Sequence, residues 1–326
     1  MTKKKVFVTR RIPEAGLEML KDKVELTINS NNRVLSRQEL LDGVKDVDGI
    51  LSLLTDKIDA EVMDKAPNLK IIANYAVGFD NVEIPEATKR GIVVTNTPDV
   101  LTETVADFTW ALMLSASRRI TEADHYTRSG QFVGWDPLLF LGYDIFGKTL
   151  GVIGFGRIGQ AVARRAQGFN MRVLYFDQIP PKGAIDPYYK KVGLDELLKE
   201  SDFITLHVPL NKDTHHFIGA KEFAMMKSSA CLINTARGPV VDEEALVKAL
   251  KTKRITGAAL DVFEQEPKLA DGLSALHNCV LAPHIASASL ETRSKMATMA
   301  ACNLLAVLDG QAPLNPVNPD ALKVIR

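Results

Sequence analysis

Short apolar runs alternate along the chain with segments in which apolar residues recur at helical spacing. In the first hundred residues the runs are rich in branched side chains, which is typical of buried strands; they are 6–8, 24–28, 49–54, 69–75 and 92–95. Segments 13–20, 36–44 and 60–65 have helical spacing. Strands that alternate with helices predict a parallel sheet covered on both faces, so residues 1 to about 99 are predicted to form one small α/β layer.

The same alternation starts again at Lys148 and predicts a second, larger sheet. Its expected strands are 149–153, 171–176, 203–208, 230–235, 256–261 and 279–282. These six strands are enough for a full doubly wound sheet. A final helix is predicted over 290–308, because Asp309 and Gly310 follow it as stop signals.

The segment between the two sheets predicts a long helix and a surface arm. Thr102 is a candidate cap for the helix, which we expect to bridge two domains. A second helical segment, 120–129, leads to residues 134–142, which are apolar but lack any periodicity. We expect an arm there, and because its apolar side chains are costly to expose, we expect a partner subunit to cover it.

Composition narrows the class of protein. A chain of 326 residues is long enough for about two domains. Lys+Arg 40 balances Asp+Glu 40, so no general field favours nucleic acid or an anionic membrane, and a small-molecule partner is expected. The three cysteines lie far apart in sequence, which predicts neither a disulfide framework nor a zinc site and favours a reducing, cytoplasmic setting. No apolar stretch is long enough for a signal peptide or a membrane span.

Residues 154–159 read G-F-G-R-I-G and fit the pattern G-x-G-x-x-G. A predicted strand runs into this turn and a predicted helix leaves it, which is the context that dinucleotide binding requires. Gly154 permits the tight turn, Gly156 leaves room for a pyrophosphate, and Gly159 lets helix and strand pack closely. Arg157 and Ile158 start the helix, whose first N–H groups favour phosphate charge. We therefore predict a cofactor site at this turn.

Asp177 ends the next predicted strand, close to the spacing of about 20 residues expected for the acid that binds the ribose. A carboxylate there accepts hydrogen bonds from both ribose hydroxyls and repels a 2′-phosphate. The sequence therefore favours NAD, with NADP the less favoured cofactor.

Three further motifs stand at or just after predicted strand ends of the second sheet: N-T-A-R-G at 234–238, D-V-F-E-Q-E-P at 261–267 and A-P-H-I-A-S at 282–287. Ligands of doubly wound sheets bind outside the carboxyl ends of the strands, so the three motifs should converge beside the dinucleotide.

Together with N-Y-A-V-G-F-D-N at 74–81 and T-N-T-P-D-V-L-T at 95–102, these motifs make the sequence resemble the D-2-hydroxyacid dehydrogenase family over nearly the whole chain, and in particular its glyoxylate/hydroxypyruvate reductase branch. The resemblance implies an α/β fold of two doubly wound parallel-sheet domains. A flavodoxin-like substrate domain would comprise 1–99 and 289–326, and a Rossmann NAD-binding domain 100–288. It also implies a substrate cleft between the domains and a homodimer.

The resemblance assigns catalysis to Arg237, Glu266 and His284, and their chemistry suits a 2-keto acid. A guanidinium fork can hold the substrate's carboxylate and carbonyl together. A histidine titrates near neutral pH and can supply the proton that the carbonyl oxygen needs when hydride arrives. A neighbouring carboxylate favours the protonated imidazole. Glu264 is the competing candidate for that carboxylate, but Glu266, which precedes Pro267, matches the family motif.

Further site residues follow from the same resemblance. Backbone N–H groups of Val77 and Gly78 would bind the substrate carboxylate, with Leu53 and Ser287 as weaker pocket candidates. Cofactor contacts beyond the glycine turn and Asp177 are expected from Thr104, Pro209, Thr235, Ala236 and Asp261. The adjacent His215 and His216 look like metal ligands, but no third ligand stands at a suitable spacing, so we predict no metal.

The sequence thus predicts an NADH-dependent reductase that converts glyoxylate, and also hydroxypyruvate, to the D-2-hydroxy acid. Two alternatives stay open. One is another D-2-hydroxyacid dehydrogenase, such as a phosphoglycerate-type enzyme, although we expect no added C-terminal regulatory domain of that type here. The other is a NAD-sensing, corepressor-like binding protein on the same fold, which can keep all three residues without catalysis. A formate dehydrogenase is disfavoured because that branch lacks the glutamate.

Overall fold

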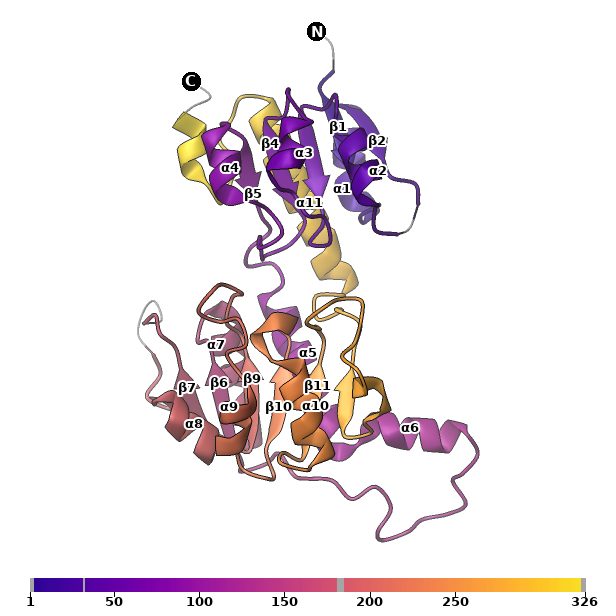
Figure 1. Cartoon of the computed structure of the whole chain (residues 1–326), viewed down its shortest axis with the longest axis vertical. Helices are drawn as coiled ribbons and strands as arrows, with labels where there is room; N and C mark the ends of the chain where they lie inside the picture. Colours follow the sequence, from indigo (N-terminus) through magenta and orange to yellow (C-terminus); the bar gives the residue numbers. More distant parts are fainter. Residues whose placement is uncertain (1–2, 32, 181–184, 324–326) are drawn as a thin grey trace. The chain divides into compact units, whose positions relative to one another are not determined.

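The computed structural model describes residues 3–31, 33–180 and 185–323. The chain forms two compact units, of which the first is Met1–Leu101 with Ala288–Arg326 and the second is Thr102–Ser287. These boundaries lie within two residues of the expected ones. In Figure 1 the yellow C-terminal helix α11 (Leu290–Leu308) accordingly lies among the indigo and purple elements of the first unit.

The first unit is built around five parallel strands in the order β2-β1-β3-β4-β5. This is the flavodoxin-like order, with its reversal between β1 and β3. The strands are β1 (Lys5–Val8), β2 (Glu25–Ile28), β3 (Gly49–Ser52), β4 (Ile71–Asn74) and β5 (Val93–Thr95). The helices that follow β1 to β4 are α1 (Glu14–Lys21), α2 (Arg37–Gly43), α3 (Ala60–Asp64) and α4 (Ile84–Lys89). The predicted parallel layer is confirmed.

The C-terminal helix completes this unit by packing against α1. A Cβ at Gly16 would lie 2.7 Å from the Ala297 carbonyl oxygen, so the two helices meet closely where glycine faces alanine. Ser289 caps α11 by accepting a hydrogen bond from the Thr292 N–H. Leu304 is wholly buried. Helix α11, near the C-terminal end of the described chain, therefore covers the sheet that contains the first strand.

The second unit contains a seven-stranded parallel sheet in the order β12-β11-β10-β9-β6-β7-β8. The order reverses between β6 and β9, which is the switch point where Rossmann folds bind dinucleotides. The strands are β6 (Thr149–Ile153), β7 (Arg172–Phe176), β8 (Tyr189–Lys191), β9 (Phe203–Leu206), β10 (Cys231–Asn234), β11 (Gly257–Leu260) and β12 (Cys279–Leu281). Its helices are α5 (Thr102–Arg118), α6 (Ile120–Arg128), α7 (Arg157–Ala166), α8 (Leu194–Glu200), α9 (Ala220–Met225) and α10 (Glu243–Lys251).

Two details differ from expectation. Strand β8 was not predicted, because an edge strand of three residues with Lys190 and Lys191 has no apolar run. Helix α5 begins at Thr102, which is therefore its first residue rather than its cap, and the helix belongs to the second unit. Its Trp110 Nε1 donates to the Val162 carbonyl of α7 at 3.0 Å, and its Thr109 hydroxyl lies 2.9 Å from that of Thr235.

The segment that follows α6 is an exposed arm. It contains no helix or strand before β6, and in Figure 1 it is drawn as a long loop that projects from its unit. Its apolar side chains are open to solvent, with Val133 95%, Trp135 86% and Leu138 75% exposed. Such a group of exposed apolar residues is unusual on a monomer surface.

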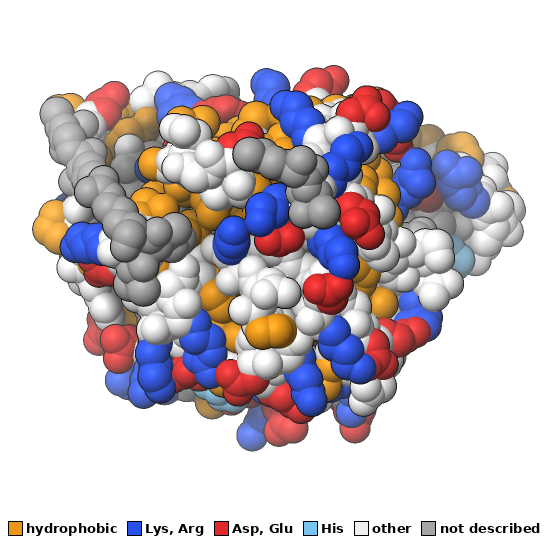
Figure 2. All heavy atoms as spheres, turned by 90° about the horizontal axis from the view of Figure 1, so that it is seen from above, with side chains coloured by type: hydrophobic (Ala, Val, Ile, Leu, Met, Phe, Trp, Pro, Cys, Tyr) orange, Lys and Arg blue, Asp and Glu red, His pale blue; other side chains and the backbone are white. Residues whose placement is uncertain are grey.

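One face of the molecule illustrates how its charges are distributed. The face drawn in Figure 2 shows basic and acidic side chains interspersed, without a large area of one sign, as the net charge of zero leads one to expect. Among the described helices, none is both long and apolar enough to cross a membrane.

Candidate active site

The glycine turn joins β6 to α7, and each glycine meets different surroundings. Gly154 has φ +89°, and a Cβ there would lie 2.6 Å from the His207 backbone. A Cβ at Gly159 would lie 2.1 Å from the Gly154 carbonyl oxygen. A Cβ at Gly156, in contrast, would meet nothing within 4 Å. Gly154 and Gly159 are therefore required by packing, whereas Gly156 borders open space where a diphosphate can approach the first N–H groups of α7.

Asp177 follows β7 and is held against this turn. Its Oδ2 accepts a hydrogen bond from the Phe155 N–H at 2.6 Å, and its Oδ1 accepts one from the Ile179 N–H at 2.9 Å. These bonds orient a half-buried carboxylate beside the β6–α7 turn. The residues present thus fit a dinucleotide whose ribose hydroxyls reach Asp177.

His284 and Glu266 form a pair at the carboxyl ends of neighbouring strands. His284 follows β12, Glu266 lies in the loop after β11, and His284 Nδ1 is 2.9 Å from Glu266 Oε2. The contact through Nδ1 leaves Nε2 as the nitrogen that can reach a substrate. Both side chains keep some solvent access, with 25% of the histidine and 31% of the glutamate exposed.

The loop that carries His284 is positioned by Asp261, at the end of β11. The wholly buried Asp261 carboxylate accepts hydrogen bonds from the N–H groups of Ile285 and Ala286, both at 2.8 Å. The Asp261 carbonyl accepts the His284 N–H at 2.8 Å, and His284 adopts a left-handed conformation with φ +56°. Non-glycine residues adopt this conformation uncommonly, so the fold orients this imidazole through a strained backbone.

The pKa of the Glu266 carboxyl group is set by opposing effects. Burial by itself would raise the pKa of its carboxyl group, but the hydrogen bond from His284, the charge of that imidazole, the Phe263 N–H and the charge of Arg237 together lower the pKa. Glu266 Oε1 accepts the Phe263 N–H at 3.0 Å, which fixes the other oxygen toward His284. The structure therefore holds a carboxylate, rather than a carboxylic acid, against the imidazole at neutral pH.

Arg237 lies in the loop after β10, the strand next to β11. Asn234 organises this loop, since its amide donates to the Arg237 carbonyl at 2.9 Å and its Oδ1 accepts the Ala236 N–H at 3.0 Å. A Cβ at Gly238 would lie 1.9 Å from the Phe263 carbonyl, so glycine permits the loop to pack tightly on the segment that carries Glu266. The fold thus brings the three predicted catalytic residues onto adjacent loops of one sheet edge.

Glu243 is a positioning residue that sequence reasoning missed. It lies in the first turn of α10 and is 3% exposed. Its carboxylate accepts hydrogen bonds from the N–H groups of Glu264, at 2.7 Å, and Ala270, at 3.3 Å, and burial raises its pKa. It therefore holds both sides of the loop that carries Glu266. An acidic residue at a helix start is common, so nothing in the sequence separates Glu243 from a solvated neighbour.

In the first unit, the expected substrate residues lie at the carboxyl ends of β3 and β4. The amides of Asn96 and Asn74 donate to the carbonyls of Val77, at 2.7 Å, and Gly78, at 2.9 Å. No described residue accepts a hydrogen bond from the Val77 or Gly78 N–H, so these two donors are available to an anion. The carbonyl of Leu53, after β3, accepts the Asn81 amide at 3.1 Å.

Comparison with known proteins decides the family. The model of the D-isomer specific 2-hydroxyacid dehydrogenase NAD binding domain matches residues 110–286, more than half of the chain. The chain belongs to the D-isomer specific 2-hydroxyacid dehydrogenase family. A glyoxylate reductase of Thermococcus gammatolerans is 53% identical over 327 residues, which cover 99% of this chain and 98% of that protein. The resemblance drawn from the motifs is confirmed.

Solved structures agree with this family. A Thermus thermophilus protein is 46% identical, with a TM-score of 0.89 over 96% of this chain and 99% of its own. The NADPH-dependent glyoxylate/hydroxypyruvate reductase of Sinorhizobium meliloti, solved with NADP and malonate, is 35% identical, with a TM-score of 0.86 over 98% of each chain. Since that relative is NADPH-dependent, membership of the family leaves the choice between NAD and NADP open.

The other expected contacts of this dehydrogenase-family chain lie on the second unit. Thr104 is in the first turn of α5, Thr235 and Ala236 precede Arg237, and the Pro209 carbonyl accepts the Thr214 hydroxyl at 2.6 Å. Ser287 is the last residue of the unit and is half-buried. Asp261 is committed to two N–H groups of the His284 loop, which gives it a positioning role in addition to the predicted nicotinamide contact. Contact of these residues with a cofactor or substrate stays a prediction.

Proposed function

We propose that this chain is an NADH-dependent reductase that converts glyoxylate, and also hydroxypyruvate, to the 2-hydroxy acid, with D configuration where the product is chiral. The observation that carries the proposal is the His284–Glu266 pair, whose nitrogen and oxygen are 2.9 Å apart, with Arg237 close enough to lower the pKa of Glu266. The names of relatives about 50% identical over the full chain support glyoxylate as the substrate.

In this proposal Arg237 binds the substrate, and the N–H groups of Val77 and Gly78 contribute to holding its carboxylate. A nicotinamide coenzyme, when bound, supplies the hydride. His284 Nε2 donates its proton to the carbonyl oxygen as negative charge develops there, and Nδ1 stays against Glu266. Glu266 stabilises the imidazolium before the transfer, and in the reverse direction the neutral imidazole takes the hydroxyl proton.

The preference for NADH rests on Asp177. Its carboxylate is fixed beside the glycine turn by the Phe155 N–H, and in this position it would accept hydrogen bonds from two ribose hydroxyls and repel a 2′-phosphate. Residues 177–180, which the structure describes, include no basic side chain that would offset this charge. The Sinorhizobium meliloti relative is NADPH-dependent, so the proposed preference for NADH is specific to Asp177 rather than to the family.

Steady-state assays of the purified chain test both parts. Glyoxylate and hydroxypyruvate should each oxidise NADH, and kcat/KM should be higher with NADH than with NADPH. Asp177→Ala should lower the ratio of kcat/KM with NADH to kcat/KM with NADPH, or bring it below one, because it removes the charge that repels the 2′-phosphate. A wild-type preference for NADPH of more than tenfold would contradict the role of Asp177 and leave the reductase proposal standing.

The same assays separate the alternatives. A phosphoglycerate-type enzyme would reduce NAD with 3-phosphoglycerate faster than with glycolate, whereas a NAD-sensing binding protein would bind NADH without consuming it in the presence of any 2-keto acid. The first result would replace the proposed substrate, and the second would replace the proposed catalytic activity.

We also propose that the functional form is a homodimer in which the arm that contains Trp135 contacts the partner subunit. The support is the exposure of its apolar side chains, which include Val133 at 95% and Leu138 at 75%.

A further inference from the structure

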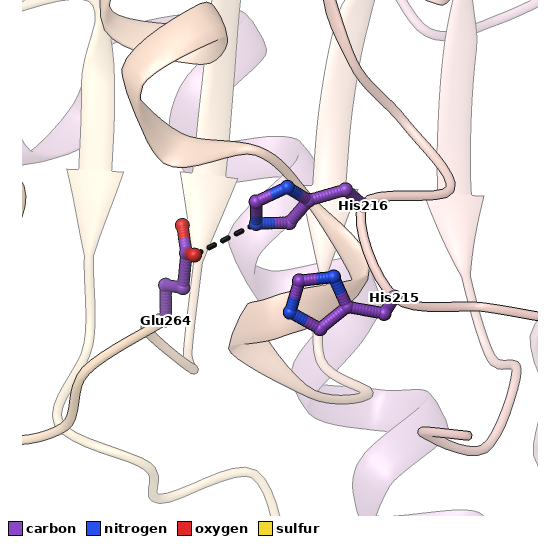
Figure 3. Close-up of side chains that lie close together, drawn as sticks. All are labelled: His215, His216 and Glu264. Carbon is purple, nitrogen blue, oxygen red and sulfur yellow. Dashed lines mark hydrogen bonds and ion pairs between the residues drawn. The ribbon is translucent and has the colours of Figure 1, made fainter. Parts of the chain in front are cut away.

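His215 and His216 gain a third potential ligand in the folded chain. Glu264 lies 48 residues beyond His216 in sequence, yet its Oε1 is 2.7 Å from His216 Nε2. One ligand atom from each of the three residues lies within 4.8 Å of the other two. Figure 3 shows a ring nitrogen of both histidines facing the Glu264 carboxylate. The reason for predicting no metal, the lack of a third ligand, therefore does not hold in the fold.

We propose that His215, His216 and Glu264 form an auxiliary site for a divalent transition-metal ion, of which Zn²⁺ is the expected occupant. Two imidazoles and one carboxylate are a ligand set that Zn²⁺ accepts, with water in the fourth position. Ligand atoms about 2.0–2.2 Å from a tetrahedral Zn²⁺ lie roughly 3.4 Å apart. The three ligand atoms, within 4.8 Å of one another, therefore need only small movements, in which His216 and Glu264 separate slightly. The bound ion would replace the hydrogen bond between His216 and Glu264.

The backbone that carries the two histidines is already ordered for this role. They lie in the loop between β9 and α9, where the His215 N–H donates to the Asn211 carbonyl at 3.0 Å and the His216 N–H donates to the Pro239 carbonyl at 2.8 Å. The two rings stack with centroids 4.1 Å apart. Binding would therefore need little ordering of the chain, which favours affinity.

Glu264 is held from the opposite side. Its N–H donates to the buried Glu243 carboxylate at 2.7 Å, and its own Oε2 accepts the Glu243 N–H at 3.3 Å. The second oxygen is thus engaged by the start of α10, and Oε1 is left toward the histidines. A carboxylate oriented by a hydrogen bond from outside the ligand set is typical of metal sites.

The loop after β10 contacts both the loop that carries the two histidines and the loop that carries Glu264. Pro239 accepts the His216 N–H, and Gly238 packs on the Phe263–Glu264 backbone. A bound ion would tie the loop after β9 to the loop after β11 across this contact. Since the three ligands come together only in the folded chain, the ion would stabilise the native state.

The chemistry of the ligands predicts a selectivity. Imidazole nitrogens suit Zn²⁺, Co²⁺ and Ni²⁺, whereas Mg²⁺ requires oxygen ligands in octahedral geometry. We expect calorimetric titration of the chelator-treated, tag-free chain to show saturable binding of one Zn²⁺ or Co²⁺ per chain, and no binding of Mg²⁺. Near-saturating Zn²⁺ should raise Tm by about 2–4 °C.

Variants test the ligands individually. His215→Asn removes a solvent-exposed ring, and Glu264→Gln keeps the shape of the side chain while weakening the ligand atom that contacts His216. Each should weaken Zn²⁺ binding by roughly tenfold or more and abolish the Tm rise. His277→Asn is the matched control, because His277 is an exposed histidine outside the group and should leave Zn²⁺ binding unchanged.

Circular dichroism without metal identifies any variant that fails to fold, and the visible absorption of bound Co²⁺ reports nitrogen ligation independently of stability. Absence of saturable Zn²⁺ binding to the wild-type chain would overturn the proposal. So would Zn²⁺ binding by folded His215→Asn and Glu264→Gln that is as tight as in the wild-type chain. A loss of Zn²⁺ binding in His277→Asn as large as in the two ligand variants would also overturn it. None of these results bears on the reductase assay, so the two proposals stand or fall separately.

Discussion

His284 combines a left-handed backbone with a carboxylate partner, and its proposed role is specific to proton transfer. We expect His284→Gln to lower kcat for glyoxylate reduction by about 10²- to 10⁴-fold, the usual contribution of a general acid. Tm should change little, since a quarter of the His284 side chain is exposed and Asp261 holds the loop by its backbone. His125→Gln, at an exposed position on α6, is the control and should retain wild-type turnover.

Glu266 is expected to act through the imidazole, and its signature is therefore a change in pH dependence. Glu266→Gln removes the charge that favours the protonated histidine, so the alkaline limb of the kcat/KM profile should move to lower pH. The measurement is the initial rate with saturating coenzyme across the pH range. A uniform loss of rate at every pH, with an unmoved limb, would show that Glu266 serves only to build the loop.

His207 predicts a pH dependence of stability. Burial lowers the pKa of this histidine from 6.5 to about 3, so the unfolded chain binds a proton that the folded chain excludes. The stability from the neutral ring is present above pH 6.5 and is lost as the pH falls toward 3. Between pH 6.5 and 4.5 this loss should be about 2 kcal/mol in the free energy of unfolding.

His207→Gln should remove that part of the loss, since glutamine can still bond the Thr205 hydroxyl but does not titrate. Urea unfolding at the two pH values, for variant and wild type, makes the comparison. Equal slopes of stability against pH would mean that the ring takes up its proton at the same pH in the folded and the unfolded chain, and would contradict the lowered pKa.

At the scale of elements, the β6–α7 turn separates a glycine needed for binding from one needed for folding. Gly156→Ala places its methyl group in open space, so Tm should stay close to wild type while the KM for NADH rises, because that space is where the diphosphate is proposed to lie. Gly159→Ala forces its methyl group to 2.1 Å from the Gly154 carbonyl and should lower Tm. Thermal melts and NADH titrations of both variants provide the test, and a Tm loss in Gly156→Ala equal to that in Gly159→Ala would contradict it.

The elements were the most predictable level of this chain. Buried strands such as β9 and β10 are continuous apolar runs, and the predicted helices 36–44 and 290–308 correspond to α2 and α11, whose first turns are capped by Ser36 and Ser289 in the structure. Strand β8 escaped prediction because a short edge strand is stabilised by its neighbour β7 rather than by its own pattern.

At the scale of the whole molecule, the arm predicts an oligomer. If a second copy covers it, Trp135→Asp combined with Leu138→Asp should convert a dimer into a folded monomer, because each change places a charge in an apolar contact. Sedimentation velocity measures the change in mass, and circular dichroism checks the fold. A wild-type chain that sediments as a monomer at assay concentrations would contradict the dimer proposal.

The composition of each unit depends on contacts between distant parts of the chain. Helix α11 joins the first unit because it packs on α1 and on strands β3 to β5, which nothing in its own apolar pattern specifies. The predicted boundaries came from the family resemblance rather than from periodicity. Periodicity by itself did not say which unit contains α5, whereas its contacts place it in the second unit.

By itself the sequence determined the alternation of strands and helices, the glycine turn with Asp177, and, through its motifs, the family. These features depend on local periodicity and on residue types that few backbone conformations accept. The family motif already pointed to Glu266 as the partner of His284, but only the tertiary structure showed that Glu264 contacts His216 and that Glu243 is buried beneath their loop. Such pairings join residues from different strand ends, so they follow from strand order and loop packing, which no local pattern encodes.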